Sequence, residues 1–329
     1  MGLYKADFMS GGSGTAVASP LGKVVADGGV SMSILPYDFY KGCTVVWNGE
    51  IHIIGSSESS YYKYHFKYNG SSWVSVSTLP YNFYYGCAVV YNDEIHIMGG
   101  NGNTTAHYKY NGSSWVSVST LPYQLHQGSA VVYNNEIHIL GGNNNTSAHY
   151  KWDGSSWSSV STLPYIYLNG SAVVYNNEIH IMGGSSDYRL HYKYNGTSWV
   201  SVSTLPYNFY YGSAVVYNNE IHILGGDGGN TNHYKYNGTS WISASTLPYS
   251  FYGGGSVVYN NEIHILGCGN SSYIKNHYYL KYGTFLIGYA KKDSEIFYPI
   301  SSTPITDNLQ AIENGYKVTA DGKVEIMNL

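Results

Sequence analysis

The stretch LPYNFYYGCAVVYNDEIHIMGGNGNTTAHYKYNGSSWVSVST (79–120) recurs along the chain and decides its fold. Its opening Leu-Pro-Tyr occurs six times, beginning at residues 35, 79, 121, 163, 205 and 247. Glu-Ile-His-Ile also occurs six times, beginning at residues 50, 94, 136, 178, 220 and 262. A repeat of about 40–50 residues is typical of one four-stranded propeller blade. The sequence therefore predicts an all-β, six-bladed β-propeller.

Short strands and tight turns account for the whole repeat. GCAVVY (86–91) is a short apolar run, typical of an inner strand buried on both faces. EIHIM (94–98) follows a two-residue turn and ends at a pair of glycines. HYKY (107–110) is the third strand, and the alternating WVSVST (115–120) fits a half-exposed outer strand. Each blade is therefore expected to be a four-stranded antiparallel sheet.

The two ends of the repeat array predict how the ring closes. The sixth copy lacks the tryptophan of the others and continues as HYYLKYGTF (277–285), whereas VSMSILP (30–36) matches the VSVSTLP of the other copies. We expect residues 30–35 to supply the outer strand of the sixth blade, which removes the free edges of an open ring. Phe285 is a candidate for the place of the missing tryptophan.

The sequence outside the repeats divides into two segments. Residues 1–29 are rich in Gly, Ser and Ala and predict a flexible attachment segment, and residues 286–329 predict a small docking segment after the propeller at 30–285. Within the latter, 307–314 predicts a short helix and 316–326 a hairpin with an Asp-Gly turn. The chain shows neither the apolar run of a signal peptide nor a membrane-spanning stretch, so we expect synthesis in a cytosol without export by a signal peptide.

Composition excludes several classes of function. Charged residues make up 11% of the chain, with 16 Lys and Arg against 20 Asp and Glu, so the chain is poorly suited to neutralise nucleic-acid phosphates. The three cysteines contain no Cys-x-x-Cys pair, which argues against a disulfide scaffold and a zinc site. The unusual feature is 38 tyrosines, which provide flat contact area with a polar tip.

The repeat resembles the kelch repeat. The shared features are two glycines after an apolar second strand, a tyrosine such as Tyr110 and then a tryptophan such as Trp115, over about residues 30–285. The turn between the tyrosine and the tryptophan is shorter than in the family, and the first and sixth copies have Gly55-Ser56 and Gly267-Cys268 in place of two glycines. The resemblance implies a propeller fold and leaves this interpretation unchanged.

Variation among the six copies is concentrated on one predicted face of the disc. We call it the loop face: it carries the crossovers between blades and the connections from the second to the third strand. The turns of the opposite face, Asn-Asn-Glu and Asn-Gly-Ser/Thr-Ser, are nearly constant. The crossovers vary but keep aromatic residues, as YNFYY (81–85), YQLHQ (123–127) and YIYLN (165–169) illustrate. Loops that merely tolerate change would favour small polar residues, so we interpret this face as a binding surface.

The candidate ligand-binding residues lie in these crossovers and loops. Aromatic rings stack on sugar faces, and the low charge fits a neutral polysaccharide, but a protein partner would use the same residue types. Arg189, with its neighbours, is either a clamp for a carboxylate or one half of a local ion pair. The candidates are Phe39, Tyr40, Lys41, Phe83, Tyr84, Tyr85, His126, Tyr167, Asp187, Tyr188, Arg189, Phe209, Tyr210, Tyr211, Phe251 and Tyr252.

The repeated polar residues predict structure and not chemistry. Six histidines lie in Glu-Ile-His-Ile and six more begin the third strand, so equivalent residues are a whole blade apart and are expected to pack between blades without binding a metal. Six glutamates in equivalent positions make a poor acid–base pair, because a general acid and a general base need different environments. We therefore predict no catalytic residue, no metal site and no cofactor.

These observations predict a non-catalytic recognition module. The repeat style resembles kelch-containing tail and receptor-binding proteins of phages, which implies a place in the virion and a host surface glycan or cell-wall polymer as ligand. That resemblance also implies contacts with other tail or virion proteins through the two terminal segments, without nucleic acid or membrane insertion, and it is compatible with a homo-oligomer. One alternative is a structural hub within a virion. Another is a polysaccharide-degrading enzyme, whose carboxylates would come from residues such as Asp38, Asp187 and Asp227.

Overall fold

The computed structural model divides the chain into two compact units. One unit is residues 28–280, and the other combines residues 1–27 with 281–329. In the first unit the structure describes residues 29–58, 60–100, 104–143, 146–184, 187–267 and 275–280. In the second it describes only short strands, at 23–24, 285–286, 290–292, 295–297, 311–312, 316–318 and 324–326.

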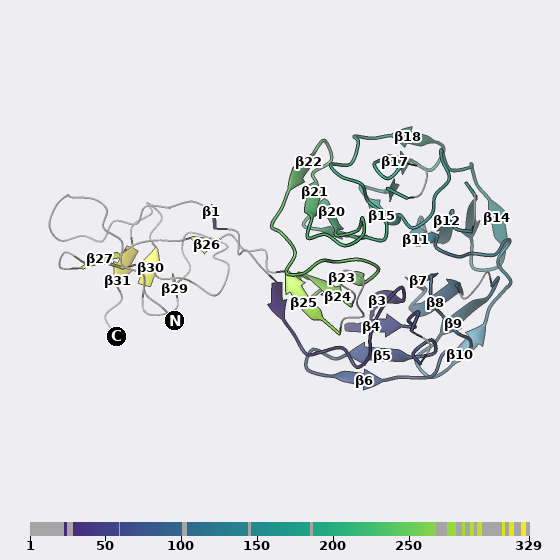
Figure 1. Cartoon of the computed structure of the whole chain (residues 1–329), viewed down its shortest axis with the longest axis horizontal. Helices are drawn as coiled ribbons and strands as arrows, with labels where there is room; N and C mark the ends of the chain where they lie inside the picture. Colours follow the sequence, from purple (N-terminus) through teal and green to yellow (C-terminus); the bar gives the residue numbers. More distant parts are fainter. Residues whose placement is uncertain are drawn as a thin grey trace. The chain divides into compact units, whose positions relative to one another are not determined.

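Six four-stranded antiparallel sheets form the propeller (Figure 1). Blade one is β3 (Cys43–Trp47), β4 (Glu50–Ile54), β5 (His65–Tyr68) and β6 (Trp73–Ser75). Blade two is β7 (Gly86–Tyr91), β8 (Glu94–Gly99), β9 (His107–Tyr110) and β10 (Trp115–Ser117). Blade three is β11 (Ser129–Tyr133), β12 (Glu136–Leu140), β13 (His149–Trp152) and β14 (Trp157–Ser159).

The remaining three blades repeat this order. Blade four is β15 (Ser171–Tyr175), β16 (Glu178–Met182), β17 (His191–Tyr194) and β18 (Trp199–Ser201). Blade five is β19 (Ser213–Tyr217), β20 (Glu220–Leu224), β21 (His233–Tyr236) and β22 (Trp241–Ser243). Blade six is β23 (Gly255–Tyr259), β24 (Glu262–Leu266), β25 (His277–Leu280) and, from the start of the chain, β2 (Gly29–Ser31). The predicted six-bladed, all-β fold is confirmed.

The N-terminal strand closes the ring as predicted. β2 pairs with β25, Val30 opposite Tyr279, while the inner strands β23 and β3 of the last and first blades contact each other. Gly29 pairs with Leu280 where Trp241 pairs with Tyr236 in the preceding blade, so glycine occupies the tryptophan position of blade six. The expectation for Phe285 is wrong: it lies in β26 (Phe285–Leu286), which pairs with β1 (Lys23–Val24).

Besides the pairing of β1 with β26, the described residues of the second unit form three further small strand pairings. β27 (Ala290–Lys292) pairs with β28 (Glu295–Phe297), and β30 (Tyr316–Val318) pairs with β29 (Ala311–Ile312) and β31 (Val324–Ile326). The strand pairing of the predicted 316–326 hairpin is therefore confirmed, and its predicted Asp-Gly turn lies outside the described residues. The predicted 307–314 helix is wrong at 311–312, because an eight-residue helix is marginal by itself and strand pairing overrides its local pattern; the rest of that helix, and residues 1–22, lie outside the described residues.

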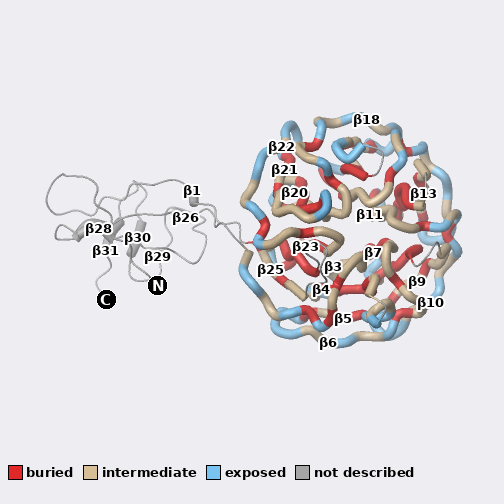
Figure 2. The backbone as a smooth tube through the Cα atoms, viewed as in Figure 1, coloured by how far each residue is buried: buried red, intermediate tan, exposed pale blue. Residues whose placement is uncertain are grey.

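The hydrophobic core lies between neighbouring blades. The second strand of each blade is buried from its second residue onward, and the inner strand alternates, so both faces of the inner half of a blade meet a neighbour. Between blades one and two, Trp47 and Val45 pack with Ile95 and Ile97. Exposure is greatest at the outer strands (Figure 2). Among the described residues, no helix is long and apolar enough to span a membrane.

A buried pair of histidines joins the second and third strands in every blade. In blade one, His52 Nδ1 and His65 Nε2 are 2.8 Å apart, and the other five pairs have separations of 2.8–2.9 Å. The His65 ring also packs against Tyr110 and Trp115 of blade two, with ring centroids 5.2 and 5.5 Å away. The repeated histidines thus hold each blade together and fasten it to the next.

Burial makes these twelve histidines sensitive to acid. It lowers the pKa of the first histidine of each pair from 6.5 to about 4. In blades one to four a nearby glutamate, such as Glu50, partly opposes the shift. Burial and then the charge of the first histidine lower the pKa of the second to about 3. Above pH 6.5 histidine protonation therefore does not lower the free energy of unfolding. Below pH 6.5 the unfolded chain takes up protons that the folded chain does not, and the free energy of unfolding falls.

We predict a steep loss of stability between pH 6.5 and 4. Each pH unit below 6.5 costs about 1.4 kcal/mol for every histidine that only the unfolded chain protonates. With twelve such histidines, the free energy of unfolding at pH 5.5 is expected to fall more than about 10 kcal/mol below its value at pH 7.5. Urea unfolding across this range measures it, above the pH at which carboxylates dominate. A urea midpoint independent of pH between 7.5 and 5.5 would contradict the role of the pairs.

Candidate functional site on the loop face

The crossovers and the second-to-third-strand connections lie on the same face, as the sequence predicts. Backbone hydrogen bonds link them: Ser57 N donates to Tyr40 O at 2.7 Å, and Asp227 N donates to Tyr210 O at 3.0 Å. A third bond, from Asn143 N to His126 O at 2.7 Å, links the same elements in blade three. The variable segments therefore form one continuous surface around the propeller axis.

The crossover residues nearest the blades are buried, which corrects the prediction for five candidates. Phe39, Phe83, Tyr167, Phe209 and Phe251 each have 0% of their surface exposed. Leu125 occupies the same place in the third crossover, also at 0%. These side chains anchor the crossovers in the core and are not available to a ligand.

A glycine after the second strand leaves room for each buried anchor. Gly183 has a φ of 66°, and a Cβ added there would overlap the carbonyl oxygen of Phe209. Its neighbour Gly184 donates its N–H to the same carbonyl at 3.1 Å. The two glycines of the repeat therefore form the seat on which the next crossover rests.

Two residues beyond each anchor, six residues form a closed ring of backbone hydrogen bonds about the axis. Tyr85 N donates to Lys41 O at 2.8 Å, the bonds continue blade by blade, and Lys41 N donates to Gly253 O at 2.7 Å. All six residues have left-handed φ values of 55–67°. We call them the axial ring: Lys41, Tyr85, Gln127, Asn169, Tyr211 and Gly253.

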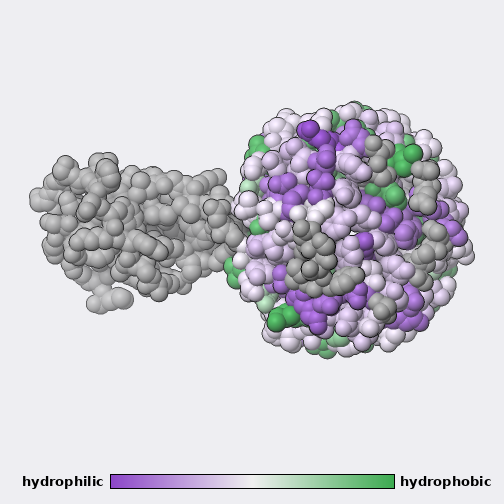
Figure 3. Space-filling view, in the orientation of Figure 1, coloured by the Kyte–Doolittle hydropathy of each residue, from purple (hydrophilic) through white to green (hydrophobic). Residues whose placement is uncertain are grey.

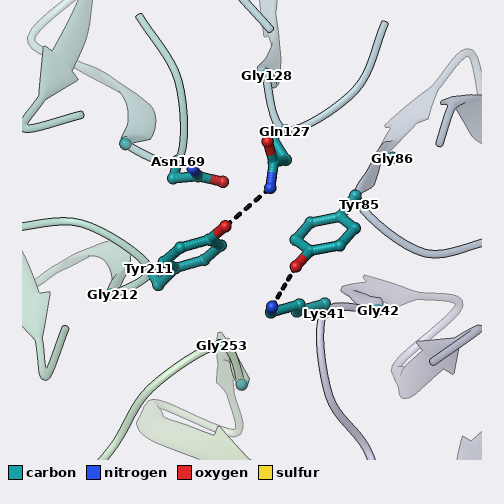
Figure 4. Close-up of a pocket in the computed structure, with 12 residues that line it drawn as sticks. Lys41, Gly42, Tyr85, Gly86, Gln127, Gly128, Asn169, Tyr211, Gly212 and Gly253 are labelled. Carbon is teal, nitrogen blue, oxygen red and sulfur yellow. Dashed lines mark hydrogen bonds between the residues drawn. The ribbon is translucent and has the colours of Figure 1, made fainter. Parts of the chain in front are cut away.

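The axial ring and the six glycines that follow it line a small pocket of about 120 Å³ (Figure 4). Its side chains come together over the axis: Lys41 Nζ donates to the Tyr85 hydroxyl, and Gln127 Nε2 donates to the Tyr211 hydroxyl at 2.7 Å. The rings of Tyr85 and Tyr211 face each other from opposite sides, with centroids 6.2 Å apart. Residues from four blades thus converge on one point.

The Lys41 ammonium lies within a group of tyrosine rings. Its Nζ is 4.3, 4.5 and 4.9 Å from the ring centroids of Tyr40, Tyr85 and Tyr211, distances at which a cation is attracted to an aromatic ring. His126 packs on Tyr85 at 4.8 Å, and burial followed by the Lys41 charge lowers the His126 pKa. Burial, followed by Tyr85, raises the pKa of Tyr211. Both shifts favour the neutral forms of these two side chains beside Lys41.

Further tyrosines surround this centre. Tyr252 contacts Tyr211 with ring centroids 5.0 Å apart. Farther out, Tyr84 stacks on Tyr62 at 5.0 Å and Tyr210 packs on Tyr188 at 4.8 Å. These rings are half-buried or exposed, so the structure brings the second group of predicted residues together on the surface.

The variable loop of blade four is held by hydrogen bonds and contains no ion pair between Asp187 and Arg189. Arg189 Nε donates to the Leu205 carbonyl at 2.8 Å, and Asp187 Oδ1 accepts the backbone N–H of Arg189 at 3.0 Å. Both interactions fix the loop near Tyr188. The predicted local ion pair is therefore not formed.

Sequence reasoning missed Gln127, Asn169 and Gly253 as members of the axial ring. Their side chains share no chemistry, because the ring uses only their backbone groups. The available signal is positional: every member directly precedes a glycine, as in Lys41-Gly42 and Gln127-Gly128.

Comparison with known proteins supports the fold and does not assign a family. No family model matches the chain, and no curated protein matches it in sequence. Solved structures do match: the structure of YjhT, a propeller, superposes with a TM-score of 0.66 at 15% identity, over 82% of this chain and 99% of that one. Likeness at this identity shows the fold alone. The chain thus contains a six-bladed β-propeller, and its function has to be argued from its own residues and not from this structural neighbour.

The left-handed axial ring predicts a specific response at Asn169. Replacing Asn169 by Val is expected to cost about 2 kcal/mol of unfolding free energy, because a β-branched residue is strained at a φ of 60°. Asn169→Gly keeps the backbone conformation and is expected to be nearly neutral. Urea unfolding compares the two variants, and equal stability of both would contradict a backbone role for the ring.

The seat beneath the crossovers predicts a larger effect at Gly183. Gly183→Ala is expected to destabilise the protein by about 2–4 kcal/mol, because the methyl group displaces the Phe209 backbone. Gly49→Ala is the control: its φ is 70°, but a Cβ there meets no described atom within 4 Å, so about 1 kcal/mol is expected. Thermal unfolding measures both losses of stability. A smaller loss at Gly183 than at Gly49 would contradict the close packing of the Phe209 backbone against Gly183.

Proposed function

We propose that this propeller is a non-catalytic recognition module that binds carbohydrate through its loop face. The observation that carries the proposal is the group of half-buried tyrosines around the axial pocket. Tyrosine offers a flat apolar face to a sugar ring and a hydroxyl to its polar edge, with little rotamer entropy to lose. Gln127 and Asn169 add amide groups beside the rings.

The distribution of exposed apolar residues favours sugar over a protein partner. The exposed aliphatic residues are mostly single residues on outer strands, such as Val74, Val116 and Val200, away from the axial pocket. The face of the propeller in Figure 3 is mainly hydrophilic, with isolated hydrophobic spots. The core of a protein–protein interface is more apolar than this.

The axial pocket favours binding over hydrolysis. Among the described residues, the twelve that line it include no aspartate or glutamate, whereas glycoside hydrolysis generally needs two carboxylates across the scissile bond. Its volume of about 120 Å³ is also well below the roughly 300–1,000 Å³ of sites that enclose a ligand. These features suit a ligand that lies across the surface with one group in the pocket.

We place this module in a phage tail or on a virion surface, with a host surface glycan or cell-wall polymer as its ligand. The support is the resemblance of its repeats to kelch-containing receptor-binding proteins. In this setting the terminal segments contact neighbouring virion proteins. A structure of the assembled particle separates this proposal from a structural hub, in which a neighbouring protein would cover the loop face.

The outer tyrosines provide the test of carbohydrate binding. We expect Tyr84→Ala and Tyr210→Ala each to weaken binding to host cell-wall glycan about fivefold, because a stacked ring contributes about 1 kcal/mol. The two residues lie in different crossovers, so the double variant should lose about 25-fold. Titration calorimetry with purified glycan measures these losses.

Tyr279→Lys is the matched control for the loss of an aromatic ring. Tyr279 lies in β25, away from the loop face, and Lys67 and Lys109 occupy the same place in other blades. Its binding should equal that of the unmodified protein. Unchanged binding in the double variant, or an equal loss in the control, would contradict the proposal.

A further inference from the structure

The axial pocket contains a lysine, Lys41, that pairs with no carboxylate among the described residues. Lysines of the third strands pair with glutamates: Lys67 Nζ lies 2.8 Å from Glu50 Oε2, and Lys109, Lys151, Lys193 and Lys235 form equivalent pairs at 2.8–3.0 Å. Lys41 forms no such pair with any of the described residues. The Lys41 ammonium lies beside the rings of Tyr40, Tyr85 and Tyr211, and it donates a hydrogen bond to the Tyr85 hydroxyl.

Tyrosine rings stabilise this ammonium without neutralising it. A lysine ammonium has three N–H donors, and one of them is used by the Tyr85 hydroxyl. Two donors and the full charge therefore remain for a group that enters the pocket. The half-buried position strengthens that interaction, because nearby apolar surface lowers the effective dielectric.

Lys41 is also the only charged member of the axial ring. The equivalent residues are Tyr85, Gln127, Asn169, Tyr211 and Gly253, and the backbone N–H groups of all six are used within the ring. Those amides are not available to an anion, so Lys41 must provide the charge. The pocket volume of about 120 Å³ suits one substituent and excludes a whole sugar ring.

From these contacts we infer that the axial pocket is a subsite for a single anionic group of the bound glycan, held by the Lys41 ammonium. The group is an oxyanion, either the carboxylate of a uronic acid or the phosphate of a phosphodiester-linked polymer. The inference rests on the proposed carbohydrate binding and narrows its ligand: the rest of the glycan, stacked on the outer tyrosines, can be neutral.

The test is a glycan array that carries neutral hexose and N-acetylhexosamine oligosaccharides beside uronic-acid and phosphodiester oligosaccharides. The unmodified protein should bind members that carry an anionic group, and which of the two anionic sets is bound identifies the oxyanion. Lys41→Gln should lose at least tenfold in affinity for them, and Lys41→Arg should recover part of that loss. Glutamine is the natural residue at position 127 of the ring, so Lys41→Gln is expected to fold, as thermal unfolding will verify.

Lys63→Gln is the matched control for charge. Lys63 is an exposed lysine in a loop-face connection of blade one and lies outside the axial pocket. Anionic ligands lost by Lys41→Gln and retained by Lys63→Gln support the subsite. Anionic ligands retained by Lys41→Gln, or ligands that are all neutral, overturn the subsite and leave the carbohydrate-binding proposal standing. Binding to no glycan contradicts both, since the subsite depends on that proposal.

Discussion

The axial ring of six backbone hydrogen bonds is the constraint on which the rest of the loop face depends. Each crossover must arrive at the axis with one residue in the left-handed conformation, so that its N–H reaches the carbonyl of the preceding blade. Only a closed circuit uses every donor and acceptor, and it closes with the bond from Lys41 N to Gly253 O, where the first and last blades meet. Closure of the ring of blades is therefore also closure of the hydrogen-bond circuit at the axis.

The buried anchor residues of the crossovers, Phe83 and its equivalents, help each crossover to reach the axial ring. A crossover is not a strand, and no ladder fixes its path. Its path is fixed where Phe83 and its equivalents fill the space above a glycine, two residues before the axial ring. The buried side chain acts together with a backbone hydrogen bond, such as Phe83 N to Tyr62 O at 2.9 Å, to position the axial-ring residue.

The sequence alone predicts the blades well and the crossovers poorly, for a physical reason. Strands have a period of two, so the repeat locates the four strands of each blade, the closing strand and the constant turns. Phe83, Tyr84 and Tyr85 are adjacent aromatic residues in three different environments. Phe83 is buried in the core, Tyr84 stacks on another tyrosine at the surface, and Tyr85 belongs to the axial ring. No periodicity separates them, because the left-handed turn at Tyr85 redirects the chain. Comparison among the six copies carries the missing signal: one place always has a large apolar side chain, and another always precedes glycine.

Because the axial ring is built from backbone hydrogen bonds, its side chains can differ from blade to blade. This variation allows an asymmetric binding site at the axis. Lysine at all six places would put six ammonium groups around one small pocket, where their mutual repulsion in a poorly hydrated space would oppose ring closure. A lysine at the axis is therefore tolerated when it occupies one of the six equivalent places and the others are uncharged. Lys41 does so beside Tyr85 and Tyr211, while Asn169 and Gly253 leave the other places neutral. The same backbone that forces the six blades to be alike thus permits the one difference that gives the face a charged centre.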